Sequence, residues 1–392
     1  MSLPPNHKLC MIPGPIEFHE DVLTAMSTPA TSHIDPGFVN TFGETLEGLR
    51  QIVETKTGQP FVVSGSGTLS WDLVLCNVIE TGDRGLVLST GLFGDRMVEC
   101  LEVYGAQVDT LRPDCLGNVP DEAAIRTALQ DAVQAGRPYK ILTITHVDTS
   151  TGVLVDVQAM ARLVQQISPS TLVAVDGVCS VAAEELRMDA WGIDIIMTAS
   201  QKALGCPPGL AIVVASQRTL AAWRNRRTKV SSYYAAWSKW LPVMQAYEAR
   251  KALYFATPAV QLVMALHVGV KQLLARGMDQ VFEAHKQTSD QFKNFVTSLG
   301  LAQLPVSKSV AAHSMSAMYY PEGVKATDLL PRLGQHGIVV AGGVHPDLAP
   351  RYFRVGHMGL SALEPERHYM DKTQNALRTS LVEAGFQPKS VA

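Results

Sequence analysis

The sequence predicts an α/β protein with a large domain, built on a mostly parallel sheet covered by helices, and a smaller C-terminal α+β domain. Three observations support this fold class. The chain has 392 residues, which is enough for two domains that share an interface. Short apolar runs alternate with amphipathic stretches through the first two-thirds of the chain. After about residue 265, helical periodicity dominates and only short strand-like pieces follow.

Six short apolar runs rich in β-branched residues predict the strands of the large sheet. Strands that are apolar on both faces are typical of a parallel sheet covered on both sides. The runs are 61–63, 86–88, 141–144, 172–175, 193–197 and 210–214. A helix is predicted over 156–167, where Asp156 is the cap and apolar residues recur at helical spacing from Met160. Such alternation indicates an open sheet that binds ligands at the carboxyl ends of its strands.

The domain boundaries are predicted from the change in pattern along the chain. We expect an N-terminal segment over 1–20, a large domain over 21–265 and a small domain over 266–392. The small domain is helical to Leu299 and then has strand-like pieces at 315–319, 338–340 and 352–355. No low-complexity linker separates the domains, so we expect them to pack together with a cleft between them.

The composition excludes several classes of partner. Hydrophobic residues make up 46% and charged residues 18% of the chain, which is typical of a well-packed soluble protein. The formal net charge is −3, so nothing in the overall charge attracts nucleic acid or an anionic membrane. No apolar run reaches the roughly 18 residues of a membrane span. Anionic substrates therefore need a local cationic site.

The cysteines and the termini give an expected location. The six cysteines form no Cys-x-x-Cys pair and no cluster at zinc-ligand spacing, so we expect reduced thiols and no metal. The start of the chain lacks the features of a signal peptide. Ser390-Val391-Ala392 differs at two of three positions from the peroxisomal Ser-Lys-Leu signal. We expect a cytoplasmic protein, with a peroxisomal or mitochondrial location left open.

The first of four motifs that carry chemistry is Ser64-Gly65-Ser66-Gly67-Thr68. It follows the predicted strand 61–63 and precedes a helical run over 69–79. Small residues let backbone N–H groups approach a phosphate, and the helix N-terminus adds positive potential. Alone this motif is weak evidence, because glycine turns after strands are common.

The second and third motifs place Asp176 and Lys202 just after two predicted strands. Alone, such an aspartate is usually a turn or helix cap, and such a lysine is usually a surface residue. One strand–connection–strand step separates them, so both can face one ring bound at the carboxyl edge of the sheet. A lysine amine and a carboxylate that keeps a pyridine nitrogen protonated are what pyridoxal phosphate requires. The pair therefore predicts a pyridoxal-phosphate enzyme.

The fourth motif is Phe353-Arg354-Val355-Gly356 in the small domain. The planar fork of an arginine matches the carboxylate of an amino acid or a 2-oxo acid. For an isolated arginine, a surface ion pair is the more common role. Arg354 is therefore a candidate substrate site only in combination with the other motifs.

Taken together, these motifs resemble the class V, fold-type I aminotransferases, most closely their alanine–glyoxylate/serine–pyruvate branch. The resemblance runs nearly end to end. The matching pieces are Ile12-Pro13-Gly14-Pro15, Gly65-Ser66-Gly67, Thr145-His146, Ser150-Thr151-Gly152, Val175-Asp176, Ser200-Gln201-Lys202-Ala203, Pro207-Pro208-Gly209, Tyr254, Thr257-Pro258 and the Arg354 segment. It implies a fold-type I transferase that binds pyridoxal 5′-phosphate and forms a homodimer.

The resemblance also implies a role for each matching residue. Lys202 attaches the cofactor and moves the proton of the substrate Cα, and Asp176 pairs with the ring nitrogen. Around the ring, Val178 and Phe93 cover opposite faces and Thr149 lies beside the phenolic oxygen. The implied phosphate contacts are Ser66, Gly67, Thr68 and Gln201, joined by Tyr254 and Thr257 of the other subunit. The substrate carboxylate is expected on Arg354, with Gly14 close by.

Two positions depart from the pattern of the family. Many relatives have tryptophan where this chain has Phe93, and some have histidine where it has Thr68. Both residues keep the physical role, because an aromatic face and a hydroxyl with a backbone N–H are still present. The roles of His33, His146 and His357 are left open.

The expected reaction moves an amino group from L-alanine to glyoxylate and gives pyruvate and glycine. Serine–pyruvate or serine–glyoxylate transamination is the nearest alternative, because a hydroxyl on the substrate is rejected only weakly. A lyase of the same fold, such as a cysteine desulfurase, would need a cysteine in the small domain, but all six precede residue 207. A dehydrogenase would need Gly at position 70, which is Ser70. A non-catalytic descendant would be expected to lose Lys202 or Asp176.

Overall fold

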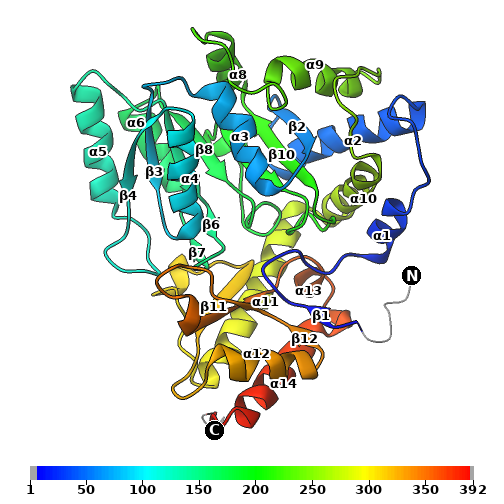
Figure 1. The fold of residues 1–392 in the computed structure, drawn as a ribbon, viewed down its shortest axis with the longest axis vertical. Helices are drawn as coiled ribbons and strands as arrows, with labels where there is room; N and C mark the ends of the chain where they lie inside the picture. Colours follow the sequence, from blue (N-terminus) through cyan, green and yellow to red (C-terminus); the bar gives the residue numbers. More distant parts are fainter. Residues whose placement is uncertain (1–6, 389–392) are drawn as a thin grey trace.

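The structure, a computed structural model, describes residues 7–388 in two lobes of unequal size (Figure 1). The predicted N-terminal segment therefore enters the description at residue 7, and Ser390-Val391-Ala392 lies outside the described residues. The larger lobe holds the main sheet, and the smaller lobe contains the C-terminal helices together with the start of the chain. Within the described range, no helix is long and apolar enough to cross a membrane.

A seven-stranded sheet in the order β2-β10-β9-β8-β5-β3-β4 forms the centre of the larger lobe. Strand β10 runs antiparallel to both of its neighbours, and the other pairs are parallel. The predicted mostly parallel sheet is thus confirmed. Its strands are β2 (Gln59–Ser64), β3 (Arg84–Leu88), β4 (Gln107–Leu111), β5 (Ile141–Thr145), β8 (Leu172–Asp176), β9 (Ile195–Ala199) and β10 (Leu210–Ala215).

Each of the six predicted strands is present in this sheet. The central strands β5, β8 and β9 are buried along their whole length, which explains their continuous apolar runs. The strand predicted over 193–197 lies two residues later along the chain, because β9 begins at Ile195 and not at Ile193. The edge strand β4 was not predicted. It is only partly buried and therefore lacks the apolar run that marks the others.

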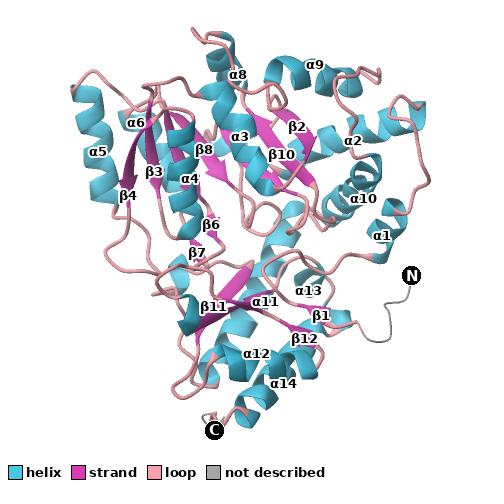
Figure 2. Cartoon of the chain, viewed as in Figure 1, coloured by secondary structure: helices cyan, strands magenta, loops and turns pink. Residues whose placement is uncertain are grey.

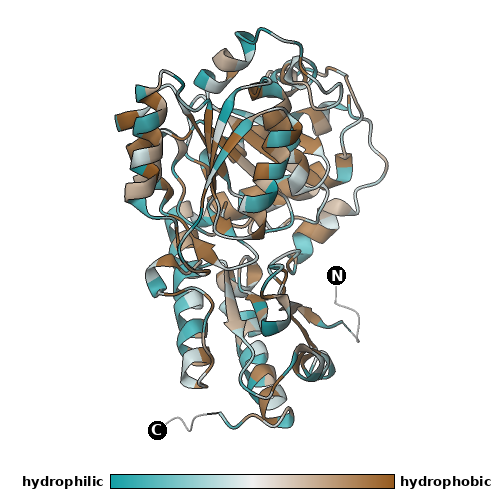
Figure 3. Cartoon of the chain, turned by 60° about the vertical axis from the view of Figure 1, so that its left-hand side comes forward, coloured by the Kyte–Doolittle hydropathy of each residue, from teal (hydrophilic) through white to brown (hydrophobic). Residues whose placement is uncertain are grey.

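Helices cover both faces of the sheet (Figure 2), and hydrophobic residues gather on the strands and on the inner helix faces (Figure 3). The helix predicted over 156–167 begins as expected, because the Asp156 side chain accepts a hydrogen bond from the Ala159 N–H at 2.9 Å. The helices of this lobe are α1 (Glu20–Met26), α2 (Pro36–Ile52), α3 (Gly67–Val78), α4 (Leu92–Val103), α5 (Glu122–Gln134), α6 (Val157–Ile167), α7 (Met188–Trp191), α8 (Gln217–Arg224), α9 (Trp237–Glu248) and α10 (Val260–Arg276).

The smaller lobe combines helices with two small sheets. An antiparallel sheet has the order β11-β14-β13, and β1 pairs in parallel with β12. These elements are β1 (Leu9–Cys10), α11 (Met278–Ser298), β11 (Met315–Tyr319), α12 (Ala326–Gln335), β12 (Ile338–Val339), β13 (Ala341–Gly342), β14 (Tyr352–Gly356), α13 (Leu360–Leu363) and α14 (Tyr369–Glu383). Met315 and Tyr352 belong to the hydrophobic cluster of the main sheet, so the lobes share apolar contacts. The exact domain boundaries stay a prediction.

The N-terminal segment runs from the smaller lobe to the edge of the main sheet. Beyond β1, the Gly356 N–H donates to the carbonyl of Met11 at 2.8 Å. A Cβ added to Gly356 would lie 3.0 Å from the Cα of Pro13, which is closer than an ordinary carbon–carbon contact. The carbonyl of Pro13 accepts a hydrogen bond from the Lys202 amine. A residue without a side chain at position 356 therefore lets the segment reach Lys202.

We predict that Gly356→Ala displaces this segment. Overpacking of this kind costs about 1–3 kcal/mol, so trypsin should cleave after Lys8 at least ~10-fold faster than in the wild type. The matched control is Gly342→Ala in β13, where the nearest atom to an added Cβ is a side-chain carbon of Leu330 at 3.7 Å. Equal cleavage rates in the wild type and Gly356→Ala would show that the segment tolerates the methyl group.

Candidate active site

A pocket of about 190 Å³ lies at the carboxyl ends of the central strands. It brings together the predicted site residues of the larger lobe other than Tyr254 and Thr257. Its lining consists of Ser66, Gly67, Thr68, Trp71, Phe93, Thr145, Val147, Thr149, Asp176, Val178, Cys179, Gln201 and Lys202. The sequence motifs that come from separate parts of the chain therefore converge on one hollow.

One end of the pocket is the N-terminus of α3. Ser66 is the N-cap, and its side chain makes no capping hydrogen bond, which leaves N–H groups of the first turn open to another partner. A Cβ on Gly67 would lie 3.2 Å from side-chain carbons of both Val178 and Ala199. This end of the pocket has the character of an anion site.

Asp176 ends β8 and lies buried in the pocket wall. Its Oδ1 accepts a hydrogen bond from the Val178 N–H at 3.0 Å. Burial raises the pKa of Asp176 to about 7, and the nearby Asp148 contributes in the same direction. A cationic group bound beside this carboxyl would therefore relieve an unfavourable burial.

Lys202 enters the pocket from the loop that follows β9. Its Nζ donates to the carbonyl of Pro13, and a Cβ added to Gly14 would lie 2.7 Å from the same Nζ. Gly14 has φ +95°, a conformation that glycine adopts most readily. Burial lowers the pKa of Lys202, and the charge of Arg354 also lowers it. A lysine with a lowered pKa is a better nucleophile, because more of its amine is neutral.

Asp148 is a site residue that sequence reasoning missed. It lies in β6 (Val147–Asp148), which pairs with β7 (Val153–Leu154). Its buried carboxylate accepts hydrogen bonds from the N–H groups of Phe93 at 3.0 Å and Gly94 at 3.2 Å, and from Ser150 Oγ at 2.6 Å. It thereby ties the start of α4, which carries Phe93, to the loop that carries Thr149. The sequence feature that could have identified Asp148 is its position between the Thr145-His146 and Ser150-Thr151-Gly152 motifs.

Other residues that line the pocket were also not predicted from the sequence. Trp71 and Val147 line the pocket without having been named as candidates. Cys179 is buried and also lines the pocket. Within residues 7–388, no group of three or more His, Cys, Asp or Glu side chains is placed to hold a metal ion. All six cysteines are free thiols.

Arg354 lies in β14 beside the pocket and is only 8% exposed. Its Nε donates to the carbonyl of Gly342 at 2.9 Å and its Nη1 to that of Thr149 at 3.1 Å. Among the residues that the structure describes, no carboxylate lies within ion-pair distance of Arg354. The alternative of a surface ion pair is therefore wrong for this residue. A buried guanidinium held only by carbonyl groups retains the capacity to bind an incoming carboxylate.

Several candidates lie outside the pocket of this single chain. Tyr254 is 60% exposed, and its ring centroid is 5.0 Å from that of His33. Thr257 is also exposed. His357 is buried and its Nε2 lies 2.9 Å from Ser316 Oγ. His146 is buried behind the pocket, in the wall of a second hollow.

The residues of the pocket fit pyridoxal phosphate. The open N-terminus of α3 suits a phosphate, the buried Asp176 suits a protonated ring nitrogen, and the Lys202 amine suits an aldehyde. These three groups border one hollow. The chemistry of the donor set thus matches the cofactor that the motifs predict.

Comparison with known proteins gives consistent matches over most of the chain. The family model "Aminotransferase class-V" matches residues 17–364. Alanine–glyoxylate aminotransferase 1 of Saccharomyces cerevisiae is 39% identical, with 95% of this chain and 97% of that protein covered. L-aspartate–glyoxylate aminotransferase of Paracoccus denitrificans is 29% identical, with 89% and 85% covered. The crystal structure of alanine–glyoxylate aminotransferase from Nostoc sp. superposes with a TM-score of 0.87 at 30% identity and covers 97% of this chain and 96% of that chain.

We predict a stability difference with a defined pH dependence for Asp176→Asn in the cofactor-free protein. Burial raises the folded-state pKa of Asp176 to about 7 from its ordinary value of 3.8. As pH rises between these values, the unfolded chain releases the proton and the folded chain retains it, so wild-type stability falls. Asparagine does not titrate. The free energy of unfolding of the variant, relative to that of the wild type, should therefore increase by up to roughly 4 kcal/mol across this pH window. Above pH ~7 this difference should increase no further.

Urea unfolding of both proteins between pH 4 and pH 8, after removal of the cofactor, measures this difference. Asp114→Asn, at an exposed position, is the control and should follow the wild type throughout. Parallel stability curves for Asp176→Asn and the wild type would contradict the raised pKa.

Proposed function

The chain belongs to the class-V aminotransferase family, and we propose that it transfers the amino group of L-alanine to glyoxylate, giving pyruvate and glycine. Membership of the family confirms the predicted resemblance. The cofactor of the enzyme is pyridoxal 5′-phosphate, and its substrates are amino acids and 2-oxo acids. The observation that carries the proposal is the convergence of Lys202, Asp176 and a carboxylate-free Arg354 on one site.

Lys202, Asp176 and Arg354 each have a separate role in the proposed reaction. Bound pyridoxal phosphate supplies a ring that stabilises the negative charge left when the substrate Cα loses its proton. Lys202 would hold the cofactor and, once its amine is free, would carry the proton from the substrate Cα to C4′ of the cofactor. Asp176 keeps a proton on the ring nitrogen. Arg354 binds the carboxylate of the substrate and fixes the orientation of Cα.

The hairpin and the N-terminal segment give these groups their positions. Asp148 holds the amides of Phe93 and Gly94, so the aromatic ring that covers the cofactor is tied to the loop with Thr149. The Pro13 carbonyl contacts the Lys202 amine and limits the space for water around it. Both effects favour a preorganised site in which charged groups interact strongly.

The shape of the site supports a small amino donor. The pocket measures about 190 Å³, and Lys202 is the only cationic residue among the described residues that line it. Arg354 lies beside this lining and is assigned to the first carboxylate. A second carboxylate on the donor would find no further arginine or lysine in that lining. The relative with 39% identity is named for alanine and glyoxylate, which supports the same donor. Serine differs from alanine by one hydroxyl and is the second candidate.

We predict the donor order in a direct competition. With glyoxylate as acceptor, kcat/KM should be highest for L-alanine, lower for L-serine by at most about 100-fold, and lowest for L-aspartate. Steady-state measurement of the 2-oxo acid formed from each donor gives the order. If kcat/KM is higher for serine than for alanine, serine replaces alanine as the donor. If it is higher for aspartate than for alanine, a cation outside the pocket lining described above binds the second carboxylate.

We further propose a homodimer in which Tyr254 and Thr257 complete the phosphate site of the partner. Both side chains are exposed in the single chain, and neither borders its own pocket. Tyr233 and Leu253 are large, exposed hydrophobic residues close to them in the sequence, with 75% and 44% of their surfaces accessible. An exposed apolar group of this kind is typical of an interface.

We predict that two inactive variants complement each other. Lys202→Ala removes the amine, and the double variant Tyr254→Phe with Thr257→Ala removes the two hydroxyl groups that are proposed to cross the interface. In a hybrid dimer, one site would receive only intact residues, so dissociated and randomly reassociated mixtures should recover about a quarter of wild-type activity. Each variant alone is the control. No recovery from a mixture that contains hybrid dimers would place all these residues in the same subunit's site.

A further inference from the structure

A second hollow of about 470 Å³ lies behind the wall of the catalytic pocket. The side chains of Thr145 and Val147 border the catalytic pocket, whereas His146 between them borders the second hollow. Successive residues of an extended chain point to opposite sides, so one stretch of backbone separates the two spaces. The family assignment and the proposed reaction make no use of this second hollow.

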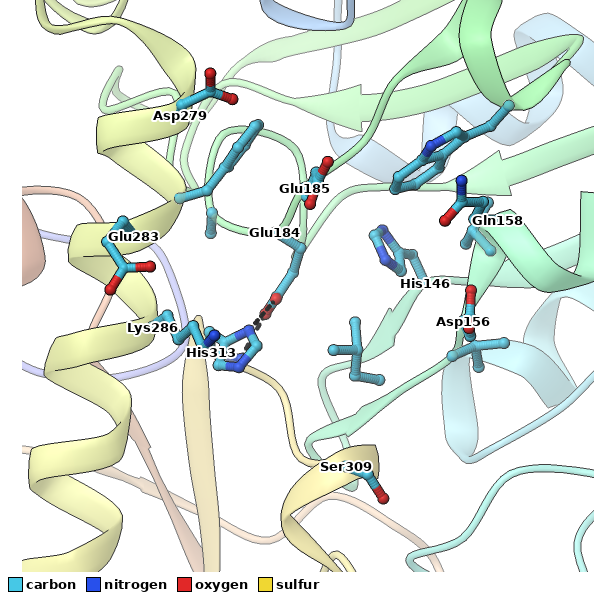
Figure 4. A pocket seen from close by; sticks show the side chains of 16 residues that line it. His146, Asp156, Gln158, Glu184, Glu185, Asp279, Glu283, Lys286, Ser309 and His313 are labelled. Atoms are coloured by element: carbon cyan, nitrogen blue, oxygen red, sulfur yellow. Dashed lines mark hydrogen bonds and ion pairs between the residues drawn. The ribbon is translucent and has the colours of Figure 1, made fainter.

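The imidazole of His146 is the central feature of the second hollow (Figure 4). The residue is only 3% exposed, and its Nδ1 is buried without a hydrogen-bond partner. Within residues 7–388, no side chain or backbone group bonds to either ring nitrogen. Burial lowers the pKa of His146 to about 4, so the ring is neutral and offers one donor and one acceptor. Buried polar groups are nearly always paired, and here the missing partner points to a ligand.

The charge of the wall indicates the kind of ligand. The wall contains five carboxylates, those of Asp156, Glu184, Glu185, Asp279 and Glu283, and one lysine, Lys286. Glu185 and Asp279 pair with Arg187, at 2.6 Å and 2.7 Å. Within the described chain, Glu283 has no cation at ion-pair distance. The wall keeps an excess of negative charge, which favours a cation.

The remaining wall suits an apolar body attached to that cation. Trp191 and Phe282 are half-buried aromatic residues that border the hollow together with Val155 and Leu154. Indole rings attract cations and also pack against flat apolar groups. The Glu184 carboxylate is held in place by the His313 N–H groups, so its position is fixed before a ligand arrives.

We propose that this hollow is a second ligand site, which binds a small organic cation with a planar head and an apolar body. The head lies between the His146 imidazole and the carboxylates, and the body lies against Trp191 and Phe282. The backbone N–H of His146 donates a hydrogen bond to the backbone carbonyl of Asp176 at 3.0 Å. A ligand here therefore contacts His146, whose backbone is hydrogen-bonded to that of Asp176, without entering the catalytic pocket.

Isothermal titration of the holoenzyme with benzamidine tests the site. An amidinium is used because a primary amine could react with the cofactor in the catalytic pocket. We expect one benzamidine per chain with a Kd of ~1 mM or tighter, and at least ~10-fold weaker binding of the uncharged analogue benzamide. Absence of saturable binding, or equal binding of benzamide, overturns the proposal.

Two variants locate the bound probe. Glu283→Gln should weaken binding about two- to fivefold, as for the loss of one exposed charge, and His146→Phe should weaken it at least ~10-fold. Glu102→Gln on α4, which is exposed and far from the hollow in sequence, is the matched control and should bind as the wild type does. If His146→Phe does not fold, the affinity of Glu283→Gln for benzamidine decides whether the probe binds in this hollow. Wild-type affinity in Glu283→Gln, or in a folded His146→Phe, means that the probe binds elsewhere and overturns the proposal.

Discussion

Burial of a carboxyl group and an amine at the same edge of one sheet is the constraint on which the rest of the structure depends. Burial raises the pKa of Asp176 and lowers that of Lys202, so both groups are held away from their preferred charged, hydrated state. Such an arrangement persists only if the surrounding elements exclude water from every side. The two central strands β8 and β9 fix the positions, and neither can move without disturbing the fully buried centre of the sheet.

Elements from distant parts of the chain close the site around these two groups. The N-terminal segment contacts the Lys202 amine through Pro13 and rests on Gly356. Gly356 and Arg354 lie in the same strand, β14, so the arginine that we propose as the carboxylate site and the support of this segment form one unit. On the other side, Asp148 ties the start of α4 to the hairpin. The smaller lobe thus lies beside the catalytic pocket, and its Arg354 supplies the positive charge that we propose for substrate binding.

The sequence predicted those features that depend on local pattern or on a recognised motif. The six strands, the helix behind Asp156 and those pocket residues that were named as candidates followed from apolar runs, short motifs or the family resemblance. Features that depend on contacts between distant segments could not be predicted in this way. Asp148 shows its role only through the amides of Phe93 and Gly94, and Arg354 differs from a surface arginine only because no carboxylate lies beside it. The unpartnered ring of His146 and the half-exposed strand β4 have no signature in the sequence.

The attachment of the cofactor to Lys202 tests the central claim most directly. The holoenzyme would be reduced with borohydride, digested and analysed by mass spectrometry, because reduction makes the link between the cofactor and its lysine permanent. We predict that the added mass lies on the peptide with Lys202 and is absent in Lys202→Ala. Lys293, the other buried lysine of the described residues, serves as an internal comparison. Added mass on Lys293 or on another lysine, or none at all in a protein supplied with pyridoxal phosphate, would contradict the account.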